Sequence, residues 1–304
     1  GGAPSGRLQG VEQEGEKTMG KIVIVGSGPA GCSAALYAAR AGQEVVVISM
    51  GMGALSKAEL IQNYYGFEEG ITGAELYRQG VAGAKAVGAE FITAEVVGLD
   101  YTGSLVVQTT EGDYPADAVI LATGAGRIAP KIAGLAEHEG RGVSYCATCD
   151  AFFYRGKTAA VLGSGEYALH EVQALLPLAG RVILCTNGEP LTADFPEGVE
   201  ICTEKLAAVE GEEKVSALRL ENGELLPVEG LFVALGVAGS AALARKLGAP
   251  VENGRIVVDE KMQTGIPGLY AAGDCTGGLL QVCKAVYEGA LAATEAIKQI
   301  RGKK

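Results

Sequence analysis

Two cysteines separated by two residues stand in the segment Cys146-Ala147-Thr148-Cys149, and an acid, Asp150, follows directly. Thiols at this spacing can close a small disulfide, and each thiolate is stabilised by its neighbour and by nearby backbone dipoles. At least one cysteine can therefore be nucleophilic near neutral pH. The spacing also suits half of a zinc site, which needs a second Cys or His pair of similar spacing. The other cysteines and both histidines are scattered, so redox chemistry is favoured over a metal site.

Composition bounds the class of protein. The 304 residues suffice for two domains, and no apolar run approaches the roughly 20 residues of a membrane span. A net charge of -11 argues against nucleic acid or an anionic membrane as partners. Most of the seven cysteines are isolated, which suits a reducing cytosol, so we expect a cytoplasmic protein.

A complete βαβ unit stands near the N-terminus. An apolar strand at residues 21–25 runs into the turn Gly26-Ser27-Gly28-Pro29-Ala30-Gly31. A helical stretch to about residue 41 and a second strand at residues 44–48 follow. Such a turn binds a pyrophosphate, because the helix N-terminus supplies N–H groups and partial positive charge.

Each glycine of this turn has a separate role. Gly26 permits the tight turn, Gly28 lets the backbone approach the pyrophosphate, and Gly31 lets helix and strand pack closely. The acid expected after the second strand is replaced by Ser49, so the adenosine ribose must be held differently.

Two later strands end in further turns, at Ala118-Val119-Ile120-Leu121-Ala122-Thr123-Gly124 and at Gly268-Leu269-Tyr270-Ala271-Ala272-Gly273-Asp274. With the first turn they resemble the flavoproteins that have two dinucleotide-binding domains. In that superfamily the final Asp binds the ribitol or phosphate of FAD, although Asp274 alone could be a helix N-cap. The resemblance implies FAD as the cofactor, held at these three turns.

The dithiol segment, residues 146–154, resembles the active-site segment of the low-molecular-weight thioredoxin reductases. Gln62-Asn63-Tyr64-Tyr65-Gly66-Phe67 is similar to that family's flavin-side loop. The resemblance runs from Met19 to a C-terminal helix at about residues 285–301. It implies an α/β fold with two Rossmann-like dinucleotide-binding domains, the second inserted in the first and carrying the dithiol. It also implies a homodimer that reduces thioredoxin.

On this resemblance we predict an FAD-binding domain from residues 19–123 and 238–304, and an inserted disulfide domain from residues 124–237. Glycine-rich hinges are expected at Ala125-Gly126 and at residues 236–239. Residues 1–18 hold no apolar stretch, so we interpret them as a disordered leader or cloning remnant and not as a signal peptide.

The inserted domain has its own βαβ unit, with strands at residues 158–162 and 181–185 around the turn Gly163-Ser164-Gly165. In the family this unit binds NADPH, whose 2′-phosphate is held by arginines just past the second strand. Here no Lys or Arg occurs between Arg181 and Lys205, and no acid ends the strand to bind a 2′-hydroxyl.

Two further departures accompany this loss. Glu166 and Tyr167 place charge and bulk at the helix N-terminus, where a pyrophosphate would lie. The helical segment that normally follows the second strand is shortened to a connection over residues 189–200. We interpret the unit as a dinucleotide fold that no longer binds NADPH.

The family usually opens its C-terminal helix with Arg-Gln-Ala, whereas this chain has Gln281-Val282-Cys283-Lys284-Ala285. Backbone N–H groups there can still reach the flavin, so the resemblance implies Gln281, Val282 and Asn63 as cofactor residues. Tyr287 is either a residue over the flavin face or an ordinary half-buried aromatic.

These departures resemble the NADPH-independent thioredoxin reductases, particularly the ferredoxin-dependent flavin type. Flavin can accept single electrons and deliver pairs, and a ferredoxin near about −400 mV lies below thioredoxin at about −270 mV. The resemblance therefore implies ferredoxin and thioredoxin as partners. An acidic ferredoxin would need a basic docking face on this acidic chain. The candidates are Arg127, Lys131, Arg141, Arg155, Lys157 and Lys284.

By family analogy, Cys149 lies nearer the flavin, Cys146 attacks the thioredoxin disulfide, and Asp150 protonates the leaving thiolate. Asp150 could instead cap a turn or helix. Three other functions stay open: a thioredoxin reductase that uses NAD(P)H through atypical contacts, an oxygen-using dithiol oxidase, and a non-catalytic redox sensor. His170 is interpreted as solvated, and the remaining cysteines, Cys32, Cys185, Cys202, Cys275 and Cys283, as isolated.

Overall fold

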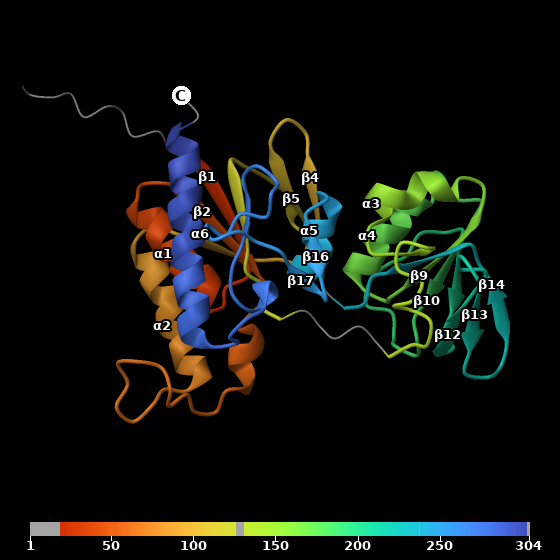
Figure 1. The fold of residues 1–304 in the computed structure, drawn as a ribbon, viewed down its shortest axis with the longest axis horizontal. Helices are drawn as coiled ribbons and strands as arrows, with labels where there is room; N and C mark the ends of the chain where they lie inside the picture. Colours follow the sequence, from red (N-terminus) through yellow and green to blue (C-terminus); the bar gives the residue numbers. More distant parts are fainter. Residues whose placement is uncertain (1–18, 126–130, 237, 303–304) are drawn as a thin grey trace, which may run out of the picture.

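The computed structural model describes residues 19–125, 131–236 and 238–302. The predicted leader, the hinge residues Gly126 and Val237, and the basic residue Arg127 lie outside these ranges. Two lobes lie along the long axis of the molecule (Figure 1). Of the helices in the described ranges, none combines the length and the apolar character that a bilayer span requires.

The first lobe is built on a five-stranded parallel sheet. Its strands, in spatial order, are β18 (Leu269–Ala271), β7 (Ala118–Leu121), β1 (Lys21–Val25), β2 (Glu44–Ser49) and β3 (Glu90–Thr93). The central strands are buried on both faces, which their continuous β-branched sequence requires.

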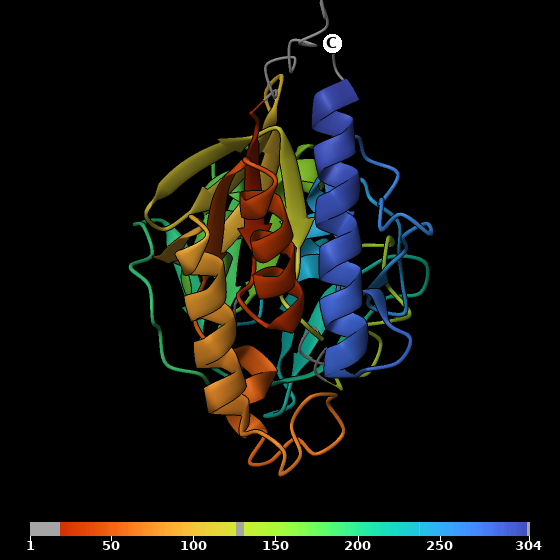
Figure 2. The ribbon, with the colours of Figure 1, turned by 90° about the vertical axis from the view of Figure 1, so that its left-hand side faces the viewer.

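Each face of this sheet is covered by different elements. Three helices lie side by side over one face (Figure 2): α1 (Pro29–Arg40), α2 (Gly73–Ala86) and α6 (Val282–Gly302). The antiparallel strands β4 (Val96–Tyr101), β5 (Leu105–Thr109) and β6 (Gly112–Ala116) pack on the other. The short helices η1 (Gly53–Lys57) and η3 (Asp274–Thr276) belong to this lobe.

The second lobe repeats this plan. Its parallel sheet has the order β11 (Val199–Cys202), β10 (Arg181–Cys185), β9 (Thr158–Leu162), β15 (Gly230–Val233) and β8 (Val143–Ser144). The helices are α3 (Ala147–Asp150), η2 (Ala151–Tyr154) and α4 (Glu166–Leu175). The antiparallel strands are β12 (Leu206–Glu210), β13 (Ala217–Leu220) and β14 (Leu225–Pro227).

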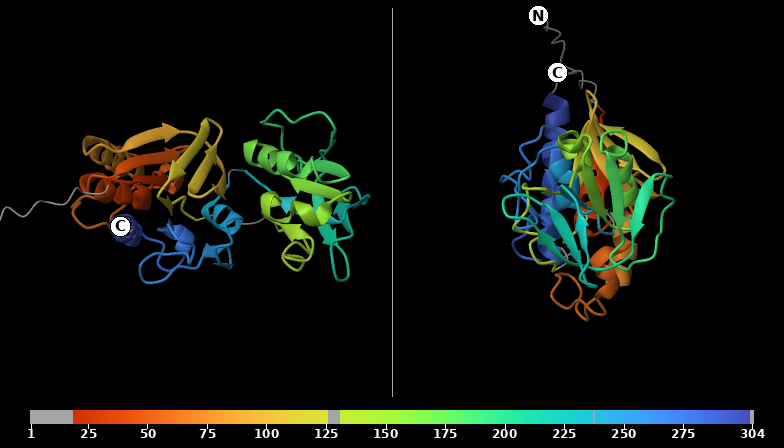
Figure 3. Two further views of the ribbon diagram at one scale, coloured as in Figure 1. Left: turned by 90° about the horizontal axis from the view of Figure 1, so that it is seen from above. Right: turned by 90° about the vertical axis from the view of Figure 1, so that its right-hand side faces the viewer.

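The lobes meet at α5 (Ser240–Lys246), which lies between them with β16 (Val251–Glu252) and β17 (Arg255–Ile256) (Figures 1 and 3). One apolar cluster runs from the first sheet through β4 and α5 to α4 and the second sheet. The chain leaves the first lobe after β7 and returns at α5, so the predicted α/β fold, with one Rossmann-like unit inserted in another, is confirmed.

Two predicted details can be compared directly. No helix interrupts the connection between β10 and β11, as the sequence indicates. The C-terminal helix begins at Val282, three residues earlier than predicted. The exact boundaries at residues 123/124 and 237/238 stay a prediction.

Gly289 lies where α6 crosses α1, and its lack of a side chain sets how closely the helices approach. A Cβ there would lie 2.1 Å from the Ala30 carbonyl oxygen. We expect Gly289→Ala to lower the free energy of unfolding by about 1–3 kcal/mol, because overpacking outweighs the gain in helix propensity. Gly83→Ala on α2, whose Cβ would meet nothing within 4 Å, is the control and should not destabilise. Denaturant melts measure both; equal stability of the two variants would contradict the close crossing.

Candidate active site

A cavity of about 1000 Å³ opens at the carboxyl ends of β1 and β7. At this point the strand order reverses, which is where open α/β sheets bind ligands. All but one of the predicted cofactor residues line it, namely Gly26, Gly28, Pro29, Ala30, Asn63, Thr123, Gly124, Gly273, Asp274, Gln281 and Val282. The exception, Gly31, packs beneath the turn.

The three glycines of the first turn are needed for different reasons. Two are required by the fold, and the third leaves space for a ligand. Gly26 has a φ of +106°, and a Cβ on Gly31 would lie 1.8 Å from the Gly26 carbonyl oxygen, so the fold itself requires both. Gly28 has a φ of −70°, which any residue adopts, and its Cβ would meet nothing within 4 Å. Its missing side chain leaves room at the cavity wall for a close ligand, so the turn fits a pyrophosphate.

Asp274 presents a carboxylate to the cavity. It is the first residue of η3, and the N-cap position belongs to Gly273, so the helix-cap alternative is wrong. No hydrogen bond or ion pair to this carboxylate occurs among the described residues. Asn63 and Gln281, which are far apart in sequence, meet at the cavity, where the Asn63 amide donates to Gln281 Oε1 at 2.8 Å. Thr123 also lines the cavity. Its hydroxyl is hydrogen-bonded to the Ser240 hydroxyl and accepts a hydrogen bond from the Ser240 N–H, so its side chain already has partners within the protein.

The place of the missing ribose-binding acid is taken by hydroxyls. The Ser49 and Ser27 hydroxyls lie 2.7 Å apart, and the Tyr77 hydroxyl lies 3.1 Å from Ser27. This cluster consists of hydroxyl groups alone, and the expectation that the ribose is held differently here stays a prediction.

Lys284 differs from its predicted role. Its ammonium donates to the Gly273 carbonyl, the Thr276 hydroxyl and the Gly277 carbonyl, and pairs with Glu288 at 3.0 Å. Its side chain is only 14% exposed. Lys284 therefore fixes the turn that presents Asp274, and the interpretation of Lys284 as a docking cation is wrong.

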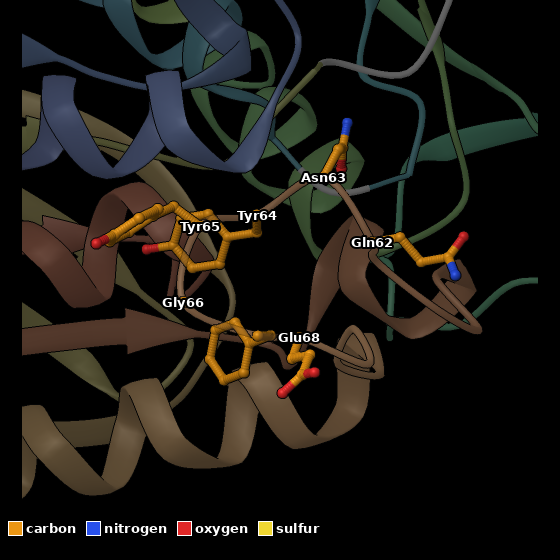
Figure 4. A pocket seen from close by; sticks show the side chains of 7 residues that line it. Gln62, Asn63, Tyr64, Tyr65, Gly66 and Glu68 are labelled. Carbon is orange, nitrogen blue, oxygen red and sulfur yellow. The ribbon is translucent and has the colours of Figure 1, made fainter.

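The flavin-side loop and Tyr287 lie at the surface. Figure 4 shows the Tyr64 and Tyr65 rings on one side of the loop and Gln62 pointing the opposite way. The Tyr64 and Phe67 rings stack at 5.9 Å, whereas Tyr65 is 98% exposed. Tyr287 is 64% exposed and does not line the cavity, so neither predicted environment of Tyr287 is observed.

Cys146 and Cys149 form a disulfide, with their Cα atoms 5.4 Å apart. Cys146 is the N-cap of α3, where its Sγ accepts a hydrogen bond from the Cys149 N–H at 3.1 Å. Cys146 is only 3% exposed, whereas Cys149 is exposed, with its Sγ near the Lys246 and Arg245 carbonyl oxygens at 3.7 and 3.8 Å. Neither cysteine lines the cavity.

Asp150 is tied to the dithiol through Ser144. The Ser144 hydroxyl donates to Asp150 Oδ2 at 2.7 Å and accepts from the Cys146 N–H at 3.1 Å. Asp150 occupies the N-cap position of η2, as its cap alternative predicts, but its side chain makes no capping bond there. Ser144 thus joins the Asp150 carboxylate to the backbone of the dithiol segment.

A buried ion pair beneath the dithiol escaped the sequence analysis. Glu171 on α4 pairs with Lys246 on α5, and each side chain is only 1% exposed. The second oxygen of Glu171 accepts the Ala147 N–H at the start of α3. Burial raises the pKa of Glu171, but hydrogen bonds from His170, Lys246 and Ala147 and the Lys246 charge outweigh it, so the pKa lies below its usual value. The carboxylate stays ionised and joins the dithiol helix to the first lobe.

The dinucleotide turn of the inserted domain is covered from two sides. Thr192, from the shortened connection, donates its N–H to the Ser164 carbonyl at 2.9 Å. The Thr192 hydroxyl lies so close to the turn that a Cβ on Gly165 would be 3.0 Å from it. Glu95, from the first lobe, has its carboxyl group near the Tyr167 N–H in the first turn of α4, while its Oε1 is buried without a hydrogen-bond partner among the described residues. A carboxylate thus lies where a pyrophosphate would bind.

Three sequence interpretations need correction here. The Tyr167 ring is buried, with its hydroxyl donating to the Tyr145 carbonyl at 3.0 Å, so it does not obstruct the turn as predicted. His170 is half-buried against Glu171 and is not solvated. Cys185 and Cys202 are not isolated, because they are paired residues of adjacent strands.

The sequence did hold a signal for Glu171. This acid shares the buried face of α4 with Tyr167 and Val172, where an acid is unexpected.

Comparisons with known proteins agree with this site. The chain matches the family described as pyridine nucleotide-disulphide oxidoreductase over residues 20–289. It is 35% identical to the thioredoxin reductase of Aquifex aeolicus (strain VF5), over 93% of this chain and 94% of that protein. The atypical thioredoxin reductase TRi from Desulfovibrio vulgaris Hildenborough has a TM-score of 0.88 at 40% identity, over 93% and 98% of the two chains. A ferredoxin-flavin thioredoxin reductase from Clostridium acetobutylicum has a TM-score of 0.71 at 35% identity, over 94% and 99%.

The free space at Gly28 gives a direct test of the cavity. Gly28→Ala should leave the melting temperature of the flavin-free protein unchanged, because the new methyl group meets no protein atom. It should weaken FAD binding by roughly 10- to 100-fold, since overpacking costs about 1–3 kcal/mol. Fluorescence titration with FAD measures the affinity. Gly31→Ala is the contrasting variant and should lose stability as well; unchanged affinity in Gly28→Ala would place the pyrophosphate elsewhere.

Removing one partner of the buried ion pair should cost far more than removing a surface partner. We expect Lys246→Met to lose about 3–5 kcal/mol at neutral pH, and the double variant Glu171→Gln, Lys246→Met to recover much of it. Lys298→Met, which removes a lysine whose side chain is 66% exposed in its pair with Glu295, is the control and should lose less than about 1 kcal/mol. Denaturant melts measure all three.

The same pair predicts a pH dependence. Because the pKa of Glu171 is lowered in the folded chain, the wild-type advantage that this carboxylate gives over the double variant Glu171→Gln, Lys246→Met is fully present above the ordinary Glu pKa of about 4.3. It is lost as the pH falls through the folded value. A loss of this advantage between pH 6 and 8 would show that another group controls it.

Proposed function

The chain belongs to the pyridine nucleotide-disulphide oxidoreductase family as a thioredoxin reductase, and from this membership we propose a specific electron route. Electrons pass from reduced ferredoxin through FAD to the Cys146–Cys149 disulfide and on to thioredoxin, without NADPH. The covered dinucleotide turn of the inserted domain is the observation that carries the choice of donor.

The first cavity suits FAD. The glycine turn and the N-terminus of α1 would hold the pyrophosphate, and Asp274 would meet the ribitol or phosphate. Asn63 and Gln281, already joined by a hydrogen bond, would position the flavin end. Bound FAD supplies the step between a one-electron donor and a two-electron disulfide.

The dithiol residues have distinct proposed roles. Cys149 receives the electron pair as a thiolate, Cys146 attacks the thioredoxin disulfide, and Asp150 protonates the leaving sulfur. In this structure the Cys149 sulfur lies next to the carboxyl end of α5. Gly239, which precedes the amino end of the same helix, lines the cavity. A seven-residue helix separates them by about 10 Å. Cys146 is buried, so the inserted domain must move both for electron transfer and for exchange with thioredoxin.

The comparisons support such movement. This chain aligns with nearly the same share of the D. vulgaris and C. acetobutylicum proteins. The TM-scores of these two alignments nevertheless differ, at 0.88 and 0.71. A difference in the relative placement of two conserved domains lowers the score in this way.

The proposal that NADPH is not used has three supports. Thr192 packs against the turn, and the Glu95 carboxyl group lies near the Tyr167 N–H at the start of α4, where a pyrophosphate would need that donor. Burial and the Glu166 carboxylate raise the pKa of Glu95, and the Tyr167 N–H opposes this rise. A bound dinucleotide would have to displace both residues and would then meet no Lys or Arg at the end of β10.

Ferredoxin is the proposed donor because it is named for a relative that is 35% identical over nearly the whole chain. With Lys284 engaged internally, the described basic residues left for docking are all exposed. They are Lys131, Arg141, Arg155 and Lys157.

Anaerobic titration tests the donor. We expect reduced ferredoxin to bleach the flavin absorbance within a catalytic turnover, and NADPH and NADH to leave it unchanged. Cys146→Ser is the matched control: it should retain FAD and its reduction by ferredoxin, yet lose thioredoxin reduction. Rapid bleaching by NADPH would contradict the proposed donor. Rapid reoxidation by oxygen with turnover of a small dithiol, and none of thioredoxin, would instead identify a dithiol oxidase.

A further inference from the structure

A second pair of cysteines lies in the inserted domain, away from the catalytic disulfide. Cys185 ends β10 and Cys202 ends β11, and they are direct partners in the parallel register of these strands. Both are free thiols in the structure. Paired residues of adjacent strands lie about 4.8 Å apart and point to the same face, within the Cα separation that a disulfide accepts. The Cα separation of the pair therefore lies in the range that a disulfide spans.

The two thiols differ in environment, which gives each a separate part in disulfide formation. Cys185 is fully buried, and its hydrogen bond to Cys202 and its burial raise its pKa. Cys202 is half-buried, and the hydrogen bond from Cys185 lowers its pKa to about 6. Burial opposes this shift, as do the Glu204 and Glu224 carboxylates, while the Glu204 N–H supports it. Cys202 is thus the accessible thiolate, and Cys185 is the protonated partner beside it.

This pair is independent of the catalytic dithiol. The sheet order places β8, which leads into the catalytic segment, three strands from β10 and four from β11. At about 4.8 Å a strand, this is roughly 14–19 Å, too far for direct exchange between the two pairs. No third metal-ligating side chain joins the pair, since the described residues contain no group of three or more such side chains. The arrangement favours a disulfide over a metal site.

We propose that Cys185 and Cys202 form a second, reversible disulfide that a hydroperoxide closes. The Cys202 thiolate attacks the peroxide oxygen, which gives a sulfenic acid and releases an alcohol or water. The Cys185 thiol then attacks the Cys202 sulfur, forming the S–S bond and releasing water. Two thiols are oxidised by two electrons and one peroxide is reduced. A small dithiol reopens the bond by exchange at the accessible Cys202 sulfur. This site does not depend on which donor feeds the flavin.

The test uses the purified flavoprotein with its catalytic disulfide oxidised, in a Cys283→Ser background that removes the exposed thiol. After hydrogen peroxide treatment, free thiols are alkylated and the non-reduced digest is examined by mass spectrometry. We expect two fewer free thiols, a Cys185–Cys202 linked peptide, and recovery of both thiols after dithiothreitol. The added change Cys202→Ser should abolish the linked peptide and leave the Cys185 thiol reduced. Irreversible oxidation of Cys202 alone, or no loss of thiols, would overturn the proposal.

Alkylation kinetics supply an independent measurement on the folded protein. The rate at Cys202 should be half-maximal near pH 6 and about 90% of its plateau at pH 7, where an ordinary thiol is only about 3% ionised. Cys185→Ala removes the hydrogen-bond donor and should shift this profile toward that of an ordinary thiol. An unchanged profile in Cys185→Ala would show that the two sulfurs do not interact and would also overturn the proposal.

Discussion

The placement of the two lobes depends on the buried ion pair between Glu171 and Lys246. An unpaired charge buried there would cost free energy, so the Glu171 and Lys246 side chains hold each other in place. The pair thereby fixes α4 of the second lobe against α5 of the first. Because the Glu171 carboxylate also accepts the Ala147 N–H, the pair sets the start of the dithiol helix. The Lys246 carbonyl in turn lies against Cys149 Sγ. The position of the redox disulfide therefore depends on this electrostatic contact together with the apolar cluster that α4 and α5 share.

An ion pair suits a contact that must also open. A large apolar interface loses its full hydrophobic stabilisation when it separates. A buried pair regains hydration when it separates, which offsets much of the lost attraction. The Glu171–Lys246 pair can thus define one arrangement sharply while contributing little net stability to it. The proposed travel of the disulfide between the flavin cavity and thioredoxin requires two arrangements of similar free energy.

The sequence was most informative where short-range geometry decides the structure. The glycine turn, the strands around it and the Cys146–Cys149 spacing are local, and each predicts its own conformation. Contacts between distant segments were not predicted, because they depend on helix rotation and on how the lobes meet. Glu171 and Lys246 are 75 residues apart, and Lys284 contacts Gly273, which precedes it by 11 residues. Asn63 with Gln281 is the exception, since the family resemblance assigned both to one cofactor.

If NADPH is not used, as proposed, the inserted domain is a dinucleotide fold that persists without its ligand. Its sheet and the inner face of α4 form an apolar core that makes no use of a nucleotide. What a lost ligand would leave behind is an unsatisfied helix N-terminus and an open glycine turn. The Glu95 carboxyl group lies near the first, and Thr192 packs on the second. Because Glu95 comes from the other lobe, the same contact that replaces a pyrophosphate also holds the lobes together. A dinucleotide would then compete with domain docking itself, so loss of the cofactor site and the observed arrangement reinforce one another.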